Sequence, residues 1–282
     1  MNYQIATLVK LKSRLKNAPK SRQNVIFPAG IEDLICGMSI ETDEYVDKDY
    51  VGTVKRLRVD VRELDPQISH SIRTNGDLPS SAIFPFLARK FLELSLTSLL
   101  ARIDPIRVIA ARKNQLDASY QIGRQNLSSV AWNGDIFSKN KANDNPWSSD
   151  SLAKGIERSL FGSHILETSI APSLRWLADQ NSQDSEWLRE LGNQDQPWNW
   201  LKQRLMQLYS ELSKGVHAEY LLDEDTTFDD SSIRLYAADC YMLVLILATA
   251  THRSPFFLRS LPIEKAIDSF RHHESRIRNL IQ

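Results

Sequence analysis

The feature of this chain that most restricts its fold is an apolar run of twelve residues, Cys240 to Thr251, which reads CYMLVLILATAT. It lies between Asp239 and His252 and is shorter than the roughly 20 residues that a membrane span needs. A helix that is apolar on every side has to be covered by other parts of the chain. We therefore expect a buried core helix here and no membrane span.

The rest of the sequence is also helical in character. Glycine (10) and proline (11) are sparse in 282 residues, and apolar side chains recur mostly at steps of three and four. A competing signal comes from Leu57, Val59 and Val61, which alternate as in a strand, although the surrounding residues keep helical steps. We predict an all-α, multi-helix protein whose length allows a large core without disulfides or metal.

Helical periodicity, turn residues and capping residues predict where the helices lie. Asp104 is a suitable N-cap and Pro105 suits the first helical position. Turn formers are dense over 73–81 and again over 133–150. We expect an N-terminal helical layer in 1–132, a linker or loop in 133–150 and a C-terminal helical bundle in 151–282. The predicted helices are 5–15, 49–64, 83–102, 104–120, 151–166, 172–179, 185–191, 197–221, 232–251 and 262–279.

Charge and cysteine content exclude several broad classes. Thirty-five basic and thirty-five acidic residues give a net charge of zero, so only local charge can indicate a charged partner. Cys36 and Cys240 have no zinc-site spacing, and phosphate loops, HExxH and GxSxG patterns are absent. The first residues do not read as a secretory signal. We expect a cytoplasmic protein with no metal and no cofactor.

The six tryptophans fall between Trp132 and Trp200. Such clustering is typical of helix packing in a core, and it also occurs on partner surfaces and base-stacking sites. Trp198 continues into a helical stripe of leucines, which favours packing at that end.

The segment LYSELSKGVHAEYLL, Leu208 to Leu222, ends an apolar helical face at Val216 and places His217 next. A histidine close to a very apolar partner helix has a pKa that responds strongly to its surroundings. His217 can therefore act as a general acid or base, or form a structural hydrogen bond within the bundle.

The sequence over about 197–254 resembles the HEPN superfamily (higher eukaryotes and prokaryotes nucleotide-binding). The resemblance is carried by a tyrosine, a Leu-Ser step and the Val-His pair, followed by a turn and a long apolar helix. Members are compact helical bundles, often dimeric, in bacterial toxin, abortive-infection and CRISPR-associated proteins, and the catalytic ones are metal-independent endoribonucleases. They carry an arginine four to six residues before the histidine, whereas 211–216 here contain none. Lys214 can take its place, an arginine can enter from another helix or subunit, or the protein is a non-catalytic binding member.

The resemblance implies a component of a bacterial anti-phage or toxin-type system that engages RNA or an RNA-containing complex. Its catalytic residues would be His217 and Lys214, acting as a metal-independent endoribonuclease. It also implies a homodimer that brings two copies of His217 to one cleft. The alternative is a non-enzymatic adaptor or oligomerisation subunit that binds another protein.

Two basic groups are candidates for phosphate binding. Near the N-terminus, Lys10, Lys12, Arg14 and Lys16 belong to six cations with no acidic residue before Glu32, a pattern that suits nucleic acid, an acidic partner, a membrane surface or plain solvation.

In the last predicted helix, the candidates are Arg271, His272 and Arg276. His272 and Arg276 are one turn apart and share a face. Basic side chains near a helix C-terminus also stabilise the helix dipole, so a structural role is open as well. A further set, Arg102, Arg107, Arg112 and Lys113, can converge on an anion or form structural salt bridges.

Overall fold

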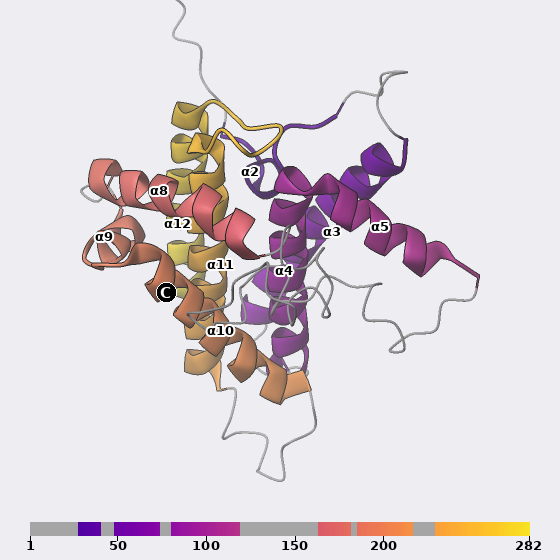
Figure 1. The fold of residues 1–282 in the computed structure, drawn as a ribbon. Coiled ribbons are helices and arrows are strands. Elements are labelled where there is room, and N and C mark those ends of the chain that lie inside the picture. Colours follow the sequence, from indigo (N-terminus) through magenta and orange to yellow (C-terminus); the bar gives the residue numbers. More distant parts are fainter. Residues whose placement is uncertain (1–27, 41–47, 74–79, 119–162, 182–184, 217–228) are drawn as a thin grey trace, which may run out of the picture.

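The computed structural model describes residues 28–40, 48–73, 80–118, 163–181, 185–216 and 229–282. These residues are 85% helical, and they form nine helices and no strand. The all-α prediction is therefore confirmed, and the alternating stretch Leu57 to Val61 lies inside a helix. The helices are α2 (Ile31–Cys36), α3 (Lys48–Arg73), α4 (Ser80–Ile103), α5 (Pro105–Leu116), α8 (Ser163–Asn181), α9 (Glu186–Gly192), α10 (Pro197–Val216), α11 (Asp230–Arg253) and α12 (Ile263–Ile281) (Figure 1).

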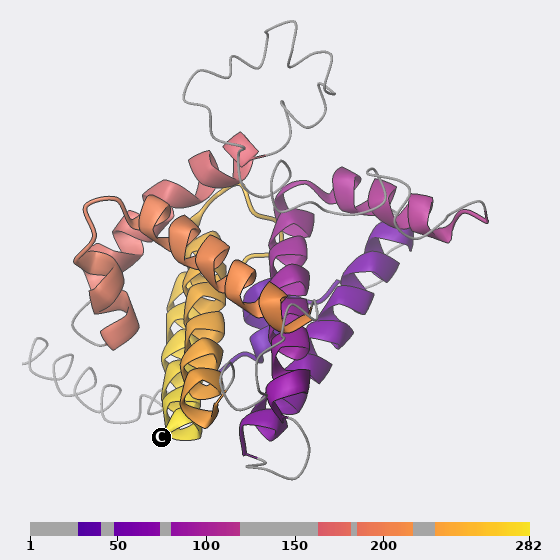
Figure 2. The ribbon, with the colours of Figure 1, turned by 90° about the horizontal axis from the view of Figure 1, so that it is seen from below.

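Helix α11 is the centre of the fold. Every residue from Tyr241 to His252 is buried, because α4, α8, α10 and α12 pack around the helix (Figures 1 and 2). Within the described ranges, α11 is the one helix long and apolar enough to cross a membrane, and 72% of its most apolar window is buried inside the protein. The apolar run is thus the core helix that its composition predicts.

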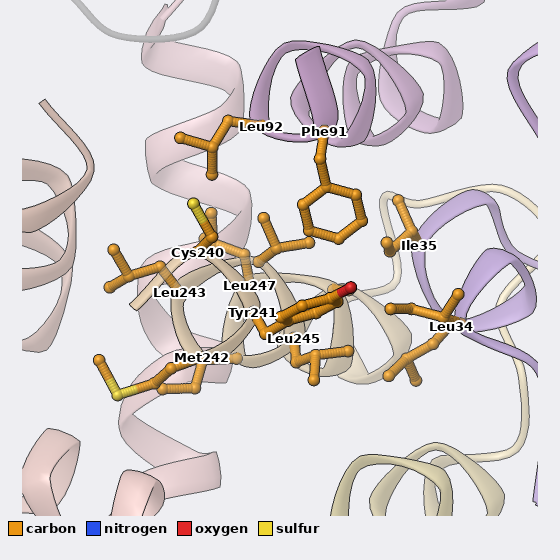
Figure 3. Packing of buried hydrophobic residues seen from close by; sticks show 14 of the residues in the cluster. Leu34, Ile35, Phe91, Leu92, Cys240, Tyr241, Met242, Leu243, Leu245 and Leu247 are labelled. Atoms are coloured by element: carbon orange, nitrogen blue, oxygen red, sulfur yellow. The ribbon is translucent and has the colours of Figure 1, made fainter. Parts of the chain in front are cut away.

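The core joins α11 to helices from both halves of the sequence. Phe91 of α4 packs against Tyr241 with 5.1 Å between ring centroids, and Leu34 and Ile35 of α2 close the same cluster (Figure 3). One hydrophobic cluster therefore includes residues on both sides of the expected linker. The linker itself, 133–150, lies outside the described residues, so the division into two regions stays a prediction.

Local capping explains where two of the helices begin. The Asp104 side chain accepts a hydrogen bond from the backbone N–H of Arg107 at 3.2 Å, and Pro105 occupies the first helical position, as predicted. Ser185 caps α9 in the same way, with its Oγ 3.1 Å from the N–H of Leu188. In both cases a short side chain satisfies a backbone donor that has no partner within its helix.

Two prolines that were predicted to bound helices lie inside helices instead. Helix α3 continues through Pro66 to Arg73, because Ile68 and Ile72 extend its buried face. Asp65 also holds this turn, since it accepts hydrogen bonds from the Tyr241 hydroxyl at 2.8 Å and from Arg276 at 2.7 Å. Tertiary contacts thus offset the backbone hydrogen bond that proline removes.

The same error occurs at Pro172, which lies inside α8 rather than at the start of a separate helix. Ile170 and Leu174 on its two sides are fully buried, so the apolar face runs across the proline. Helix α2 was not predicted at all, because six residues are too few to show a period.

The described tryptophans serve packing. Trp187 and Trp198 are buried, while Trp176 and Trp200 lie against the main core cluster. Trp132 and Trp147 lie outside the described residues. For four of the six indoles, the packing interpretation is therefore confirmed.

A buried arginine joins several helix ends at one edge of the core. The Arg102 side chain is fully buried, and its guanidinium donates to Leu258 O at 3.0 Å and to Thr251 Oγ1 at 2.5 Å. It also lies 3.1 Å from Ser260 Oγ and 3.5 Å from Ile35 O. Burial, together with the nearby Arg259 cation, lowers the pKa of Arg102 to about 9, so the group stays charged at neutral pH.

His252 completes this junction as a neutral ring. Its Nε2 donates to Leu34 O at 2.8 Å, so its Nδ1 accepts from the Leu261 N–H at 2.9 Å and from Arg102 at 3.3 Å. Burial and the Arg102 cation lower the pKa of His252 to about 3. The charge of Arg102 is therefore offset by the carbonyl groups of Ile35 and Leu258 and by neutral side-chain acceptors.

Candidate functional site

The predicted site residues fall into two groups. Lys10, Lys12, Arg14, Lys16 and His217 lie outside the described residues. Lys214, Arg271, His272 and Arg276 lie within α10 and α12, so their surroundings can be compared with the roles predicted for them.

Lys214 lies in the last turn of α10. Its Nζ is 2.9 Å from Glu211 Oε2, one turn earlier in the helix, and the lysine side chain is half exposed. The Glu211 carboxylate therefore partly neutralises the positive charge with which Lys214 would attract a scissile phosphate. Lys214 therefore lies in the last turn of α10 as half of an ion pair.

A second polar cluster is centred on Tyr209, five residues before Lys214 in α10, and was not predicted from the sequence. The Tyr209 hydroxyl lies 2.7 Å from Arg89 Nη2 and 3.0 Å from Glu93 Oε1, and both partners belong to α4. Arg89 and Glu93 also pair with each other at 3.0 Å. Burial, followed by the Glu93 charge, raises the pKa of Tyr209. An arginine therefore reaches α10 from another helix, although a carboxylate accompanies it.

The predicted basic residues of α12 lie on different faces of that helix. Arg276 faces α3, where Nη2 contacts Asp65 Oδ1 at 2.7 Å, and it also lies 5.9 Å from the Tyr241 ring. His272 is exposed. Arg271 lies 3.8 Å from Asp268 and lines a pocket on the side of α12 that carries α9. Arg276 and Arg271 therefore do not converge on one ligand.

A pocket lies between α9 and α12 at the surface of the protein. It encloses about 520 Å³ and is polar, with three arginines and two glutamates around it. Both helices supply cations, so Arg189 of α9 faces Arg271 and Arg278 of α12. The lining residues are Ser185, Glu186, Arg189, Arg271, Glu274, Ser275, Arg278, Asn279 and Gln282.

Packing of α9 on α12 builds this pocket. Trp187 is buried and lies edge-on to Phe270 of α12, with 6.2 Å between ring centroids. Its backbone N–H donates to Glu274 Oε1 at 3.3 Å. With Trp187 turned inward, its neighbour Glu186 and the residue one turn later, Arg189, are left at the pocket rim.

The two glutamates of the pocket have different environments. Glu274 is 5% exposed, and besides the Trp187 N–H it contacts Arg278 Nε at 3.5 Å. Glu186 is 61% exposed and forms ion pairs with Arg278 of α12 and, at 3.7 Å, with Arg189 of its own helix. Glu274 is therefore an anchor for α9, whereas Glu186 is a surface carboxylate between two arginines.

Sequence reasoning found part of this site. Arg271 was predicted to bind phosphate, and Arg278 lies two turns later in α12. Glu186 and Arg189 were missed, because Glu186 lies 92 positions before Arg278 and neither residue belongs to a motif. The adjacent His273 is buried, where its Nε2 donates to Ala29 O at 3.0 Å, and burial lowers the pKa of this histidine to about 4.

No group of three or more His, Cys, Asp or Glu side chains in the described ranges could hold a metal ion. Cys36 and Cys240 are both free and buried, and burial raises the pKa of each thiol. Neither thiol is placed as a metal ligand or a nucleophile.

Comparison of the chain with protein-family models, with curated proteins and with solved structures finds no match.

Proposed function

We propose that the protein is a HEPN-like component of a bacterial anti-phage or toxin-type system that engages RNA or an RNA-containing complex. The observation that carries this proposal is the α9–α12 pocket, where arginines from two helices face each other around a concave surface. An arginine fork can hold two oxygens of one phosphate, so three such groups in one pocket suit a phosphodiester backbone. The HEPN part of the proposal comes from the resemblance of the sequence around His217 to that superfamily.

The supporting side chains were found by independent routes. Arg271 belongs to the group that the sequence assigns to phosphate binding, whereas Arg189 joins it only through the packing of Trp187 against Phe270. The contact with RNA would be made mainly to the backbone, and the affinity should fall as the salt concentration rises.

The enzymatic part of the proposal depends on His217. In metal-independent RNA cleavage, a base takes the proton of a 2′-hydroxyl, the 2′-oxygen attacks phosphorus, and the departing 5′-oxygen receives a proton from an acid. Two copies of His217 in a homodimer could supply the base and the acid. Lys214 could supply charge at the phosphate once Glu211 has moved away.

The test uses a labelled single-stranded RNA with the full-length protein in the presence of a chelator. Binding that is weakened by Arg271→Gln, but not by Arg56→Gln on the exposed face of α3, supports RNA engagement through the pocket. Cleavage that disappears in His217→Ala while binding persists supports the endoribonuclease. Absence of RNA binding at low salt contradicts the proposal.

A specific observation favours the alternative, a non-enzymatic adaptor that holds another protein. Arg89, Lys214, Arg271 and Arg276 each lie beside a carboxylate, which weakens their pull on phosphate. Exposed large apolar residues, including Phe256 and Leu258, follow the end of α11. An adaptor should show no RNA binding and no cleavage, and light scattering should still show a self-associated or partner-bound species.

A further inference from the structure

We infer that Glu186 is a built-in competitor for phosphate in the α9–α12 pocket, and that a phosphate group takes its place between Arg189 and Arg278. The inference rests on the proposed function. It adds that the Glu186 carboxylate excludes anions that bind the pocket only weakly. It concerns the phosphate group itself, whether this belongs to an RNA backbone or to a free phosphate.

The first argument is the position of the Glu186 carboxylate. It forms ion pairs with Arg278 from α12 and with Arg189 from α9, so one anion bridges cations from two helices. A phosphate in the same place would accept from the same guanidinium donors, with two non-bridging oxygens in a phosphodiester and four oxygens in a free phosphate. The carboxylate therefore marks the point in the pocket where an anion is already favoured.

The second argument is how loosely this carboxylate is held. Glu186 is 61% exposed and Arg189 is 57% exposed, so water screens their attraction and the side chain can swing outward at little cost. Glu274 in the same pocket cannot do so, because it is buried and accepts the Trp187 N–H that anchors α9. Only one of the two carboxylates is replaceable without loss of packing.

The third argument is the change in charge on displacement. With Glu186 in place, three arginines face two glutamates in the pocket. When Glu186 moves away, Glu274 is the one acidic side chain left among the residues that line the pocket, and the pocket gains net positive charge. A phosphate that contacts several of these arginines replaces the lost ion pairs, whereas an anion that contacts only one of them does not.

The test compares Glu186→Gln with Glu190→Gln. Glu190 lies one turn later in α9, pairs with Arg204 at 3.5 Å and does not line the pocket. We expect Glu186→Gln to tighten binding of a fluorescent single-stranded RNA by about fivefold, the size of one exposed ion pair. Glu190→Gln should leave the affinity unchanged, and neither change removes a buried contact.

A second pair of variants tests the mechanism. In an Arg189→Gln background, Glu186→Gln should give a much smaller gain, because half of the cation pair is already gone. An equal gain in both backgrounds overturns the inference, since it would mean that Glu186 acts only as a distant negative charge. Thermal denaturation of each variant identifies any loss of folded protein.

A titration with inorganic phosphate, as a competitor of RNA and alone by calorimetry, separates the two proposals. RNA binding that is unaffected by Glu186→Gln overturns the inference and leaves RNA engagement to another surface. Phosphate binding that Glu186→Gln strengthens, without RNA binding, supports the inference and contradicts the RNA function. If neither ligand binds to the protein or to Glu186→Gln, both proposals fail.

Discussion

Arginines at two places in this molecule perform opposite tasks with the same side chain. Arg102 is fully buried, and among the described residues its hydrogen-bond partners are carbonyls, hydroxyls and one neutral imidazole. Arg189 and Arg278 lie at a pocket rim, and their partners are carboxylates. The buried cation is held by fixed dipoles, whereas the rim cations share the exposed Glu186 carboxylate, which we propose another anion can replace.

This difference distinguishes an arginine that stabilises the fold from arginines that can bind a ligand. A buried charge with neutral acceptors cannot exchange partners without exposing them, so Arg102 fixes α2, α4, α11 and the loop after α11 in one arrangement. An exposed charge paired with a carboxylate can exchange its partner in water at small cost. We therefore expect mutations to change stability at the first place and ligand binding at the second.

The largest effect should come from Arg102→Ala. The substitution leaves several buried acceptors without a donor and opens a cavity, so the free energy of unfolding should fall by about 4 kcal/mol. Arg102→Lys should cost less, because an ammonium group still reaches some of the acceptors. Guanidinium-induced unfolding followed by far-ultraviolet circular dichroism measures both. A loss below about 1 kcal/mol for Arg102→Ala would remove the contrast between the two regions.

Acid should destabilise the buried side of the comparison next most strongly. The folded pKa values of about 3 for His252 and about 4 for His273 lie below the ordinary histidine value. Between those values and about pH 6.5 the unfolded chain binds more protons, so stability is complete above about pH 6.5 and falls as the pH drops. From pH 7 to pH 5 the free energy of unfolding should fall by about 3 kcal/mol.

Denaturant midpoints at several pH values check this slope. His273→Gln should roughly halve it, since one of the two depressed pKa values is removed and the amide can still donate to Ala29 O. An unaltered slope in His273→Gln would contradict the prediction.

A smaller loss is expected from Gly37→Ala, which tests the contact beside Arg102. Gly37 has φ of 75°, and a Cβ there would lie 2.5 Å from the Arg259 carbonyl oxygen and 3.1 Å from Arg102 Nε. Strain and clash together should lower the free energy of unfolding by about 2 kcal/mol.

Gly30→Ala is the matched control for Gly37→Ala. Its backbone has φ of −60°, and the new methyl group would meet only the end of the Glu32 side chain, which can move. Chemical denaturation should place this variant within about 0.5 kcal/mol of the wild type. Equal losses for the two alanines would show that the close approach to Arg259 is not what limits Gly37.

The smallest effect on stability should come from Arg189→Gln at the pocket rim. Its ion pair with Glu186 is exposed on both sides, so the free energy of unfolding should change by about 0.5 kcal/mol or less. Thermal denaturation measures the change, while RNA binding in the same variant should weaken. A loss of stability as large as that of Arg102→Ala would mean that the rim arginines stabilise the fold, as Arg102 does.

Features set by neighbouring residues could be predicted from the sequence. The helical character, the Asp104 cap with Pro105 and the buried run from Cys240 to Thr251 depend on side-chain period and on contacts within one turn. The continuation of helices through Pro66 and Pro172 could not be predicted, because it depends on other helices covering the residues that follow.

In the candidate site, too, local features could be predicted from the sequence, whereas features that depend on helix packing could not. Basic residues on α12 were recognisable, but the sequence could not tell that Arg276 faces Asp65 while Arg271 faces a pocket. Two arginines on one helix have similar local surroundings, and the helices that pack on each side decide their roles. His217 and the N-terminal cations, outside the described residues, remain predictions.

The sequence by itself thus determined that the chain is all-α and that α11 lies at its centre, since period, capping and hydrophobicity act over a few residues. Only the tertiary structure decided which arginine is buried and which ones line a pocket. Arg102 meets Ile35, Thr251 and Leu258 across 67, 149 and 156 positions of sequence, and Glu186 meets Arg278 across 92. Contacts at such separations depend on how whole helices pack, which no local pattern records.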